Sequence, residues 1–473
     1  MNIKKVLFIN PFPYYTPGIN EATTYPPIGV AYLAAVLEKK GIEVKIIDAN
    51  AFSLTNKEIY RQAKKFSPEI IGITTNIHTA RAGRELGEFL RKKFPNKIII
   101  FGGPYATAEP DIILKETKAD FVVKGEGELT IIDLLDNIDN AESVKGISYR
   151  KNNKIIHNPP RELIEDLDTV PFPAYHLLPE FKYYHMRSRK TPVGFLMGSR
   201  GCPFHCIYCN SNIFGKRFRP RSVSNMLYEV ELLVGRYKVK QIEILDDNFT
   251  LDTARAEKFF DEIVKRKIKV LFNMKNGVRA DRITPVLARK MKRAGVCAAL
   301  IGVESGDLGV QKIIKKSLDL KKVIKTVKLL RKEGIIVNCS FIIGLPGETR
   351  KSLQRTIDFA IAVNPHMANF MMAVPFSQTE LYRMITEKGK FTEKIDYGTN
   401  TGYFSKQFSY EIGEVNQALV NEFLARAFRQ FYFRPAKVFD MIFSIRSIGE
   451  LRWTIKSFTE ILGLYGKQIV SSS

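Results

Sequence analysis

Short apolar runs alternate with longer stretches of helical periodicity along residues 1–145. Strands and helices that alternate in this way are typical of a doubly wound α/β domain with a parallel sheet. Ligands of such sheets bind beyond the carboxyl ends of the strands. We therefore expect a site in the segments that follow the strands. The predicted strands are residues 6–9, 44–47, 70–73, 98–101 and 121–123, and the predicted helices are residues 28–40, 56–66 and 79–94.

A second alternation runs from residue 191 to residue 390. Six repeats of strand and helix predict a partial parallel (β/α)6 barrel, in which functional side chains project from the carboxyl ends of the strands. The predicted strands are residues 194–197, 241–245, 270–273, 298–303, 337–343 and 367–374, and the helices include residues 224–237, 254–266, 285–294, 321–333 and 350–363.

Two further regions complete the predicted organisation. Residues 146–190 indicate a hairpin that turns at Asn152 and Asn153, followed by a proline-rich linker. Residues 391–473 are expected to be helical and are rich in aromatic and basic side chains, such as those near Trp453. This C-terminal region either caps the barrel mouth or contacts a membrane surface as a basic aromatic helix.

Composition narrows the function classes. No apolar run approaches eighteen residues, so no membrane span is expected, and the N-terminus lacks the features of a signal peptide. Five cysteines in 473 residues do not form a disulfide framework, which favours a reducing cytoplasm. Cys297 and Cys339 stand in apolar surroundings and are interpreted as small buried hydrophobes.

The net charge of +24 arises from 73 Lys and Arg residues against 49 Asp and Glu residues. The basic residues are spread along the chain, as in the solvated surface of a lysine-rich protein. No appended RNA-binding module accompanies them. Nucleic acid is therefore not an expected partner, and a role in tRNA or protein modification has no support beyond the charge.

The most informative motif is the cysteine run of residues 201–210. Cys202, Cys206 and Cys209 are separated by gaps of three and two residues, and no fourth cysteine follows nearby. A [4Fe–4S] cluster normally takes four thiolates, so three leave one iron open for a ligand that is not protein. The rival hypothesis is a zinc site with His205 as the fourth ligand, but zinc motifs usually need a separated second half.

With Tyr208 before the last cysteine, the motif resembles the signature of the radical S-adenosylmethionine (SAM) superfamily. Residues 1–385 resemble its branch with an N-terminal cobalamin-binding domain, which includes the anaerobic magnesium-protoporphyrin IX monomethyl ester cyclase. The resemblance implies a [4Fe–4S] cluster held by the three cysteines, SAM on the open iron, and an external one-electron reductant such as flavodoxin or ferredoxin. Cleavage of SAM would then give a 5′-deoxyadenosyl radical, with the protein orienting the cofactors.

The resemblance also implies SAM contacts at the ends of the barrel strands. An acidic residue after the second strand suits the SAM ammonium, although an aspartate there can instead cap a helix. Arg279 is a candidate for the SAM carboxylate, with a structural salt bridge as the alternative. The SAM-binding candidates are Tyr208, Asp246, Asp247, Arg279, Glu304, Ser340 and Gly344.

The cobalamin pattern is only partly present. The Asp-x-His-x-x-Gly segment after the first strand is missing, while the stretch from Thr75 resembles the later Ser-x-Leu and Gly102-Gly103 the Gly-Gly. Either cobalamin binds without a histidine under cobalt, or the domain only shapes the substrate cleft. His78 is interpreted as a helix-start residue that faces solvent. The cobalamin-binding candidates are Asn10, Thr75, Gly102, Gly103 and Gly125.

The sequence therefore predicts an anaerobic, cytoplasmic radical SAM enzyme that methylates an unactivated carbon of a small molecule. One alternative is cobalamin-assisted cyclisation or carbon–carbon bond formation on a porphyrin or an isoprenoid lipid, which a membrane-peripheral C-terminus would suit. Another is a non-catalytic iron–sulfur or cobalamin sensor, although a sensor has no need of an open iron. The substrate itself is not identified.

Overall fold

The fold was analysed in a computed structural model that describes residues 3–13, 23–179, 183–185, 188–210, 213–393, 395, 397 and 408–444. The chain divides into two compact units. Unit 1 comprises Met1–His185, Ser211–Arg221 and Asp396–Thr401, and unit 2 comprises Met186–Asn210, Ser222–Ile395 and Gly402–Ser473. Among the described residues, no helix has the length and apolar character needed to span a bilayer.

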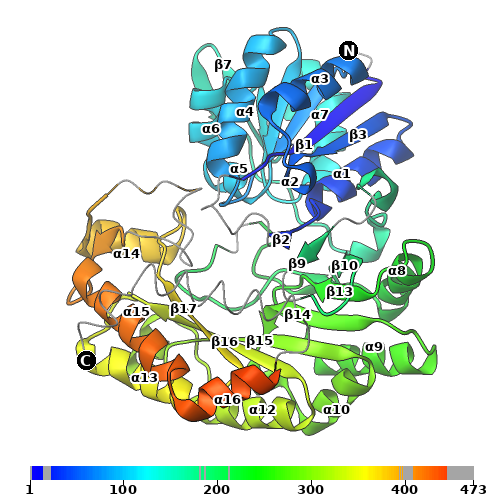
Figure 1. The fold of residues 1–473 in the computed structure, drawn as a ribbon. Helices are drawn as coiled ribbons and strands as arrows, with labels where there is room; N and C mark the ends of the chain where they lie inside the picture. Colours follow the sequence, from blue (N-terminus) through cyan, green and yellow to red (C-terminus); the bar gives the residue numbers. More distant parts are fainter. Residues whose placement is uncertain are drawn as a thin grey trace. The chain divides into compact units, whose positions relative to one another are not determined.

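Unit 1 is built on a seven-stranded sheet in the order β3-β1-β4-β5-β6-β7-β8 (Figure 1). Its first five strands are parallel and confirm the predicted doubly wound domain. Because the strand order reverses between β1 and β4, ligands are expected at the carboxyl ends of these two strands. The parallel strands are β1 (Lys5–Asn10), β3 (Glu43–Asp48), β4 (Ile70–Thr74), β5 (Ile98–Gly102) and β6 (Phe121–Val123).

Helices connect these parallel strands, as the periodicity predicted. Helix α3 shows the local logic, because Thr55 and Glu58 form a capping box at its start. The helices of unit 1 are α1 (Ile28–Lys39), α2 (Ala49–Phe52), α3 (Asn56–Phe66), α4 (Ala80–Lys93), α5 (Pro104–Ala108), α6 (Pro110–Thr117) and α7 (Gly127–Asp136), with short 3-10 turns η2 (Ile138–Ser143), η3 (Leu167–Thr169) and η4 (Tyr175–Leu177).

The predicted hairpin is present, but it is part of the first sheet. Asn152 and Asn153 both adopt positive φ, 50° and 61°, as a tight hairpin turn requires. Strand β7 (Ile147–Lys151) pairs antiparallel with β6 and with β8 (Lys154–His157). The buried apolar side chains of β7 explain this placement, because they complete the core at the edge of the sheet. Two short strands, β2 (Thr23–Thr24) and β9 (Tyr184–His185), form a separate antiparallel pair.

Unit 2 is built on a six-stranded parallel sheet whose strands follow chain order, with β10 and β17 at its edges. All six predicted strands are present, and the sheet is open. Its outer face packs on helices through phenylalanines such as Phe272, which contacts Phe259 and Phe260 of α9. The strands are β10 (Val193–Leu196), β13 (Gln241–Ile244), β14 (Leu271–Val278), β15 (Val296–Glu304), β16 (Ile336–Ile343) and β17 (Met367–Met372).

The helices of unit 2 follow the strands in turn. They are α8 (Val223–Gly235), α9 (Thr253–Lys265), α10 (Pro285–Arg293), α11 (Leu308–Ile313), α12 (Leu320–Lys332), α13 (Arg350–Val363) and α14 (Glu380–Lys388), with a 3-10 turn η5 (Ala280–Arg282). The remaining short strands are β11 (Ser199–Arg200), β12 (Arg219–Pro220, in unit 1), β18 (Lys390–Phe391) and β19 (Tyr410–Glu411).

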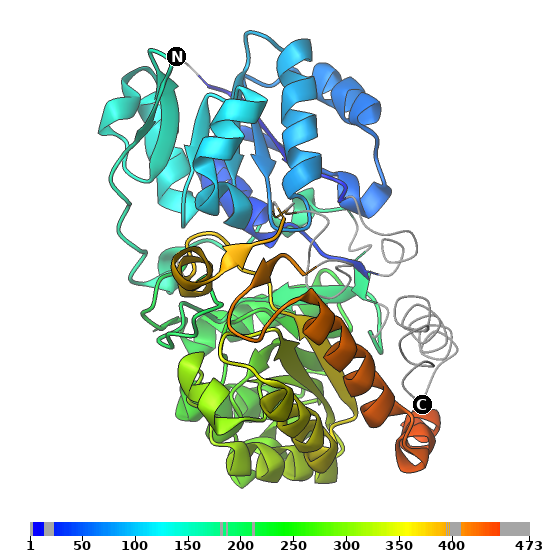
Figure 2. The same cartoon turned by 90° about the vertical axis from the view of Figure 1, so that its left-hand side faces the viewer.

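The C-terminal region covers an edge of the second sheet. Helix α15 (Gln417–Tyr432) runs alongside α13 and packs on β17, and α16 (Pro435–Ser444) follows it (Figure 2). The Tyr432 hydroxyl accepts from the Ala368 amide at 3.1 Å and donates to the Ala368 carbonyl at 2.8 Å. An exposed strand edge invites further pairing, so α15 protects β17. The region around Trp453 lies outside the described residues.

Candidate functional site

The three motif cysteines lie in the loop that follows β10 and β11. All three are free thiols, Cys202 and Cys206 partly exposed and Cys209 exposed. Burial raises the pKa of the Cys202 thiol. Burial also raises the pKa of the Cys209 thiol to about 12, although the residue as a whole is exposed. Asp247 and the neighbouring thiols raise both pKa values further. The thiols are therefore electrostatic neighbours on one loop, which fits a cluster with three cysteine ligands.

The start of this loop is held by Asp246 at the end of β13. Its carboxylate accepts the Gly198 amide at 2.8 Å and the Ser199 hydroxyl at 2.5 Å, and the side chain is fully buried. Gly198 must be small, because a Cβ there would lie 2.5 Å from the Met226 sulfur. Of the two predicted aspartates, Asp246 thus orients the cysteine loop, while Asp247 is exposed and faces the thiols.

The middle of the loop is held by backbone hydrogen bonds and one ring. The Ile207 amide donates to the Ile314 carbonyl at 3.2 Å, and the Ile207 carbonyl accepts from Leu381 at 2.9 Å. The Arg279 guanidinium stacks 3.8 Å from the centre of the Phe204 ring. Protein contacts thus hold the loop on both sides of Cys206.

Arg279 matches the salt-bridge alternative. Its guanidinium makes two hydrogen bonds of 3.0 Å to Asp281 and donates to the carbonyls of Lys316 and Ser317. Arg279 therefore supports the Phe204 ring. Its contact with SAM stays a prediction.

Glu304 ends β15 in a buried ion pair that the sequence did not reveal. Its Oε1 lies 3.1 Å from the Lys316 Nζ, and the Ser340 hydroxyl donates to Oε2 at 3.4 Å. Glu304 has a φ of 69°, a left-handed conformation that costs a non-glycine residue energy. Gly302 leaves room for the pair, since a Cβ there would lie 2.5 Å from Glu304 Oε1.

Two other predicted SAM contacts are crowded by the protein itself. Tyr208 is half-buried, and burial raises its pKa well above the usual range, with Glu304 and Cys206 adding to the effect. At Gly344, which has a φ of 103°, a Cβ would lie 2.6 Å from the Phe408 ring. The close approach that this glycine permits is therefore made by Phe408.

In unit 1, Asn10 lies at the carboxyl end of β1 in a polar network. Its amide donates to Asp48 Oδ1 at 2.8 Å, and the Tyr183 hydroxyl donates to Asp48 Oδ2 at 3.0 Å. Burial raises the pKa of Asp48 despite these donors. Asn10 thus links the ends of two adjacent strands to the connector that contains Tyr183.

The glycine candidates and Thr75 behave differently. Thr75 is fully buried, its hydroxyl bonded to the Gly102 carbonyl and its methyl packed near Gly83. Gly103 has a φ of 89°, and a Cβ there would lie 2.6 Å from the Thr75 carbonyl oxygen. At Gly102 a Cβ would meet the Val123 carbonyl oxygen at 3.8 Å, an ordinary van der Waals contact. Gly103 is therefore packed closely against Thr75, whereas Gly102 is less crowded.

Gly125 and Glu126 follow β6, and Glu126 holds a second buried ion pair. Arg219 makes two hydrogen bonds of 2.9 Å to the Glu126 carboxylate, and both side chains are at most 4% exposed. The Ile164 amide also donates to Glu126 at 2.8 Å, and Arg219 donates to the Phe214 carbonyl. The chain that leaves the cysteine loop is thus clamped to the β6 turn within unit 1.

In the described part of the chain, the histidines near the predicted sites are not grouped with other metal-binding side chains. His205 is exposed, whereas His78, expected at the surface, is half-buried, and burial lowers its pKa. The backbone amide of His78 donates to the Asn76 side chain at 2.8 Å, and this hydrogen bond holds His78 within the turn. Within the described ranges, no three His, Cys, Asp or Glu side chains converge on a single-ion position.

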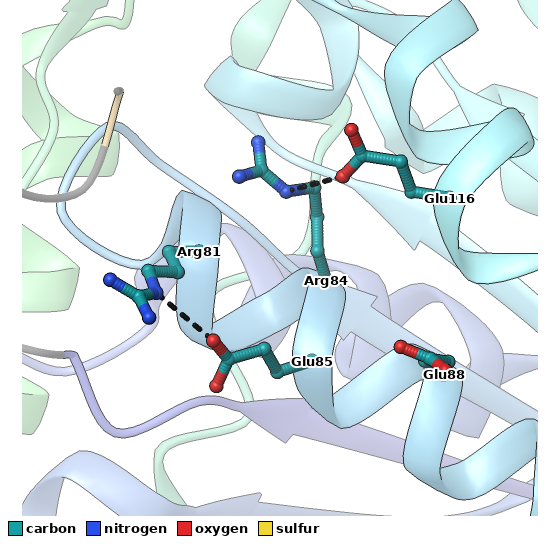
Figure 3. Close-up of a pocket in the computed structure, with 5 residues that line it drawn as sticks. All are labelled: Arg81, Arg84, Glu85, Glu88 and Glu116. Carbon is teal, nitrogen blue, oxygen red and sulfur yellow. Dashed lines mark hydrogen bonds and ion pairs between the residues drawn. The ribbon is translucent and has the colours of Figure 1, made fainter.

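A hollow of about 300 Å³ lies on unit 1 at α4 and α6, away from the predicted site residues (Figure 3). Its lining is entirely charged, with ion pairs from Arg81 to Glu85 at 3.0 Å and from Arg84 to Glu116 at 2.9 Å. Charged, exposed pairs of this kind are typical of a solvated surface. We assign the hollow no part in the site.

Two family profiles match the chain. The radical SAM superfamily matches residues 196–360, and the B12 binding domain matches residues 18–135. An uncharacterized methyltransferase of Pyrococcus horikoshii is 33% identical over 455 residues, covering 94% of this chain and 95% of the relative. The anaerobic magnesium-protoporphyrin IX monomethyl ester cyclase of Rubrivivax gelatinosus is 27% identical over 450 residues, covering 92% and 80%.

A solved structure has a similar fold. The cobalamin-dependent SAM radical enzyme OxsB, with aqua-cobalamin bound, superposes with a TM-score of 0.75 at 17% sequence identity, covering 98% of this chain and 72% of that one. At this identity the likeness concerns the fold, and it confirms the predicted succession of two α/β units.

Proposed function

The chain belongs to the radical SAM superfamily, in the branch that carries a B12-binding domain, and on that basis we propose that it methylates an unactivated carbon of a small molecule. The family makes the protein an enzyme and implies three cofactors: a [4Fe–4S] cluster, SAM and cobalamin. The observation that carries the proposal is the cysteine loop, in which three free thiols stand together at the carboxyl end of the second sheet.

When bound, the cluster supplies the electron that cleaves SAM, and cobalamin supplies a methyl carrier. The protein contributes the side chains that would bind the cofactors. Cys202, Cys206 and Cys209 would bind the cluster, and Asp246 keeps their loop in place through Gly198 and Ser199. Asp247, beside the thiols, is the acid that we assign to the SAM ammonium.

In unit 1, we assign cobalamin to the carboxyl ends of β1, β4 and β5. This is the topological switch point of the sheet. Gly102 and Gly103 would present their backbone to the corrin. Asn10, held by its hydrogen bond to Asp48, would contact the cofactor through the rest of its side-chain amide. Gly125 contributes an open turn, since a Cβ there would meet only the Ile213 carbonyl at 3.7 Å.

Methylation is favoured over cyclisation because the methyltransferase relative matches almost the full length of this chain. Cobalamin-assisted cyclisation on a tetrapyrrole is the second candidate, and the cyclase relative supports it. A sensor is disfavoured because it has no need of the open iron that three thiolates leave on a [4Fe–4S] cluster. We further propose a flavodoxin or ferredoxin as electron donor and the cytoplasm as the location.

The test uses the full chain, purified and reconstituted without oxygen, then reduced in the presence of SAM that carries a trideuterated methyl group. We expect 5′-deoxyadenosine and, with an extract of small molecules, a product heavier by one deuterated methyl group. A cyclised product without the label would favour the second candidate. Cys206→Ala is the control, and 5′-deoxyadenosine formation equal to that of the control would refute the enzyme assignment.

A further inference from the structure

Lys316 follows α11 and pairs with Glu304 at the carboxyl end of β15. Its Nζ sits 3.1 Å from Glu304 Oε1 and directly above Gly302, where a Cβ would lie 3.0 Å from it. The Lys316 side chain is 14% exposed and that of Glu304 is 8% exposed. The sheet, rather than solvent, therefore surrounds this ion pair.

The turn that carries Lys316 is attached to the cysteine loop. Ile314, two residues before Lys316, accepts the Ile207 amide between Cys206 and Cys209. The Lys316 carbonyl also accepts from Arg279, whose guanidinium stacks on Phe204 of the same loop. Lys316 is thus fixed relative to the thiols through two independent contacts.

The electrostatic interactions of Lys316 also indicate that its ammonium lies close to the thiols. Burial alone would lower the pKa of Lys316, but the Glu304 carboxylate and Cys206 raise it, so the side chain stays an ammonium. In turn, this ammonium opposes the rise in the pKa of Cys202 and Cys209. Asp247 also acts on the thiols, and Arg279 near the loop is neutralised by Asp281.

Glu304 acts as the holder of this charge. Its left-handed backbone and its contact with Ser340 fix the carboxylate over Gly302. A strained residue persists only where its surroundings impose it. A lysine is a flexible point charge, so without Glu304 its ammonium would have no fixed position beside the loop.

We propose that Lys316, held by Glu304, sets the reduction potential of the iron–sulfur cluster. The proposal rests on the cluster assigned under the proposed function. Reduction adds one electron to the cluster, and a nearby fixed positive charge stabilises the added negative charge. Lys316 is a positioning and tuning residue in this account, and the two partners act with opposite sign.

The test is a dithionite titration of the reconstituted full chain without SAM, followed by electron paramagnetic resonance. Lys316→Gln should lower the potential, because it removes the ammonium and leaves the Glu304 carboxylate. Glu304→Gln should raise it, because the amide oxygen can still accept from the Lys316 ammonium while the negative charge is lost. We expect at least a tenfold change in the ratio of reduced to oxidised cluster at fixed potential, which is about 59 mV for one electron. Lys316→Arg should stay near the parent.

Lys315→Gln is the matched control. Lys315 is the neighbouring lysine, but it pairs with Glu380 at 2.6 Å and is half exposed, so its removal should leave the potential unchanged. Unchanged potentials in both Lys316→Gln and Glu304→Gln, or shifts of the same sign, would overturn the proposal. If the parent protein holds no cluster, the proposed function itself fails. Should Lys316→Gln not fold, Glu304→Gln decides the outcome: a raised potential supports the proposal, and an unchanged or lowered potential overturns it.

Discussion

Each unit of the molecule places one glutamate in a buried ion pair beyond a parallel strand. After β6, Glu126 binds Arg219 through two hydrogen bonds, and backbone groups of Ile164 and Phe214 complete the arrangement. After β15, Glu304 meets Lys316 through one contact and adopts a left-handed backbone. The first pair makes several hydrogen bonds on backbone with ordinary φ, whereas Glu304 meets Lys316 through a single contact on a strained backbone.

This difference separates a structural clamp from a functional charge. A planar guanidinium suits bidentate binding of a carboxylate, whereas a lysine ammonium acts as a point charge. Glu126–Arg219 therefore fixes chain segments, and its charges satisfy each other. Glu304–Lys316 keeps a charge beside the thiols at the cost of backbone strain. Burial of an ion pair alone does not reveal which role it has.

The largest expected effect concerns the clamp. Arg219→Met leaves Glu126 buried without its partner, and breaking such a pair typically costs about 3–5 kcal/mol. We expect that loss in the free energy of unfolding, measured by urea denaturation, together with protease cleavage near residues 213–221. The potential of any cluster retained should not move. An unchanged unfolding free energy would show that the pair is no clamp.

A smaller effect is expected at Asp246, another buried acid at a strand end. Asp246→Asn keeps the shape but replaces one acceptor oxygen with a donor that faces the Gly198 amide or the Ser199 hydroxyl. Such a mismatch costs about 1–3 kcal/mol. Iron content per chain should fall. Asp358→Asn, at an exposed position on α13, is the control for stability; equal iron loss in both variants would contradict the loop-anchoring role.

A further effect is a pH dependence at Glu348. Its carboxyl accepts the amides of Gly344 and Leu345, and burial raises its pKa to about 8. Because the folded pKa exceeds the unfolded one, the stabilisation is present at low pH and is lost as pH rises through about 8. Glu348→Gln should flatten the melting temperature between pH 5 and pH 9. A parent profile that is already flat would contradict the raised pKa.

The sequence predicted the strands, the cysteine loop and the glycine turns because these depend on local patterns. Alternating apolar runs specify the strands, and close spacing specifies the thiols. Lys316 was missed because two neighbouring lysines in a sequence usually indicate a solvated surface. Only the fold shows that Lys316 pairs with Glu304. Likewise, 93 positions separate Glu126 from Arg219, and no local signal joins them.

Roles of single side chains were the least predictable part. Thr75 was expected to face a cofactor, yet it is fully buried and bonds to Gly102. Gly344 was expected to admit a ligand, yet Phe408 from a distant segment fills that space. Both outcomes depend on which neighbour packs against the strand end, and this is a tertiary property.

The most direct test of the central claim is the metal content and magnetic resonance spectrum of the protein prepared without oxygen. We predict about four irons per chain, a reduced-cluster signal that changes when SAM is added, and the loss of both in Cys206→Ala. Zinc in place of iron, or a cluster signal that SAM leaves unchanged, would contradict the account.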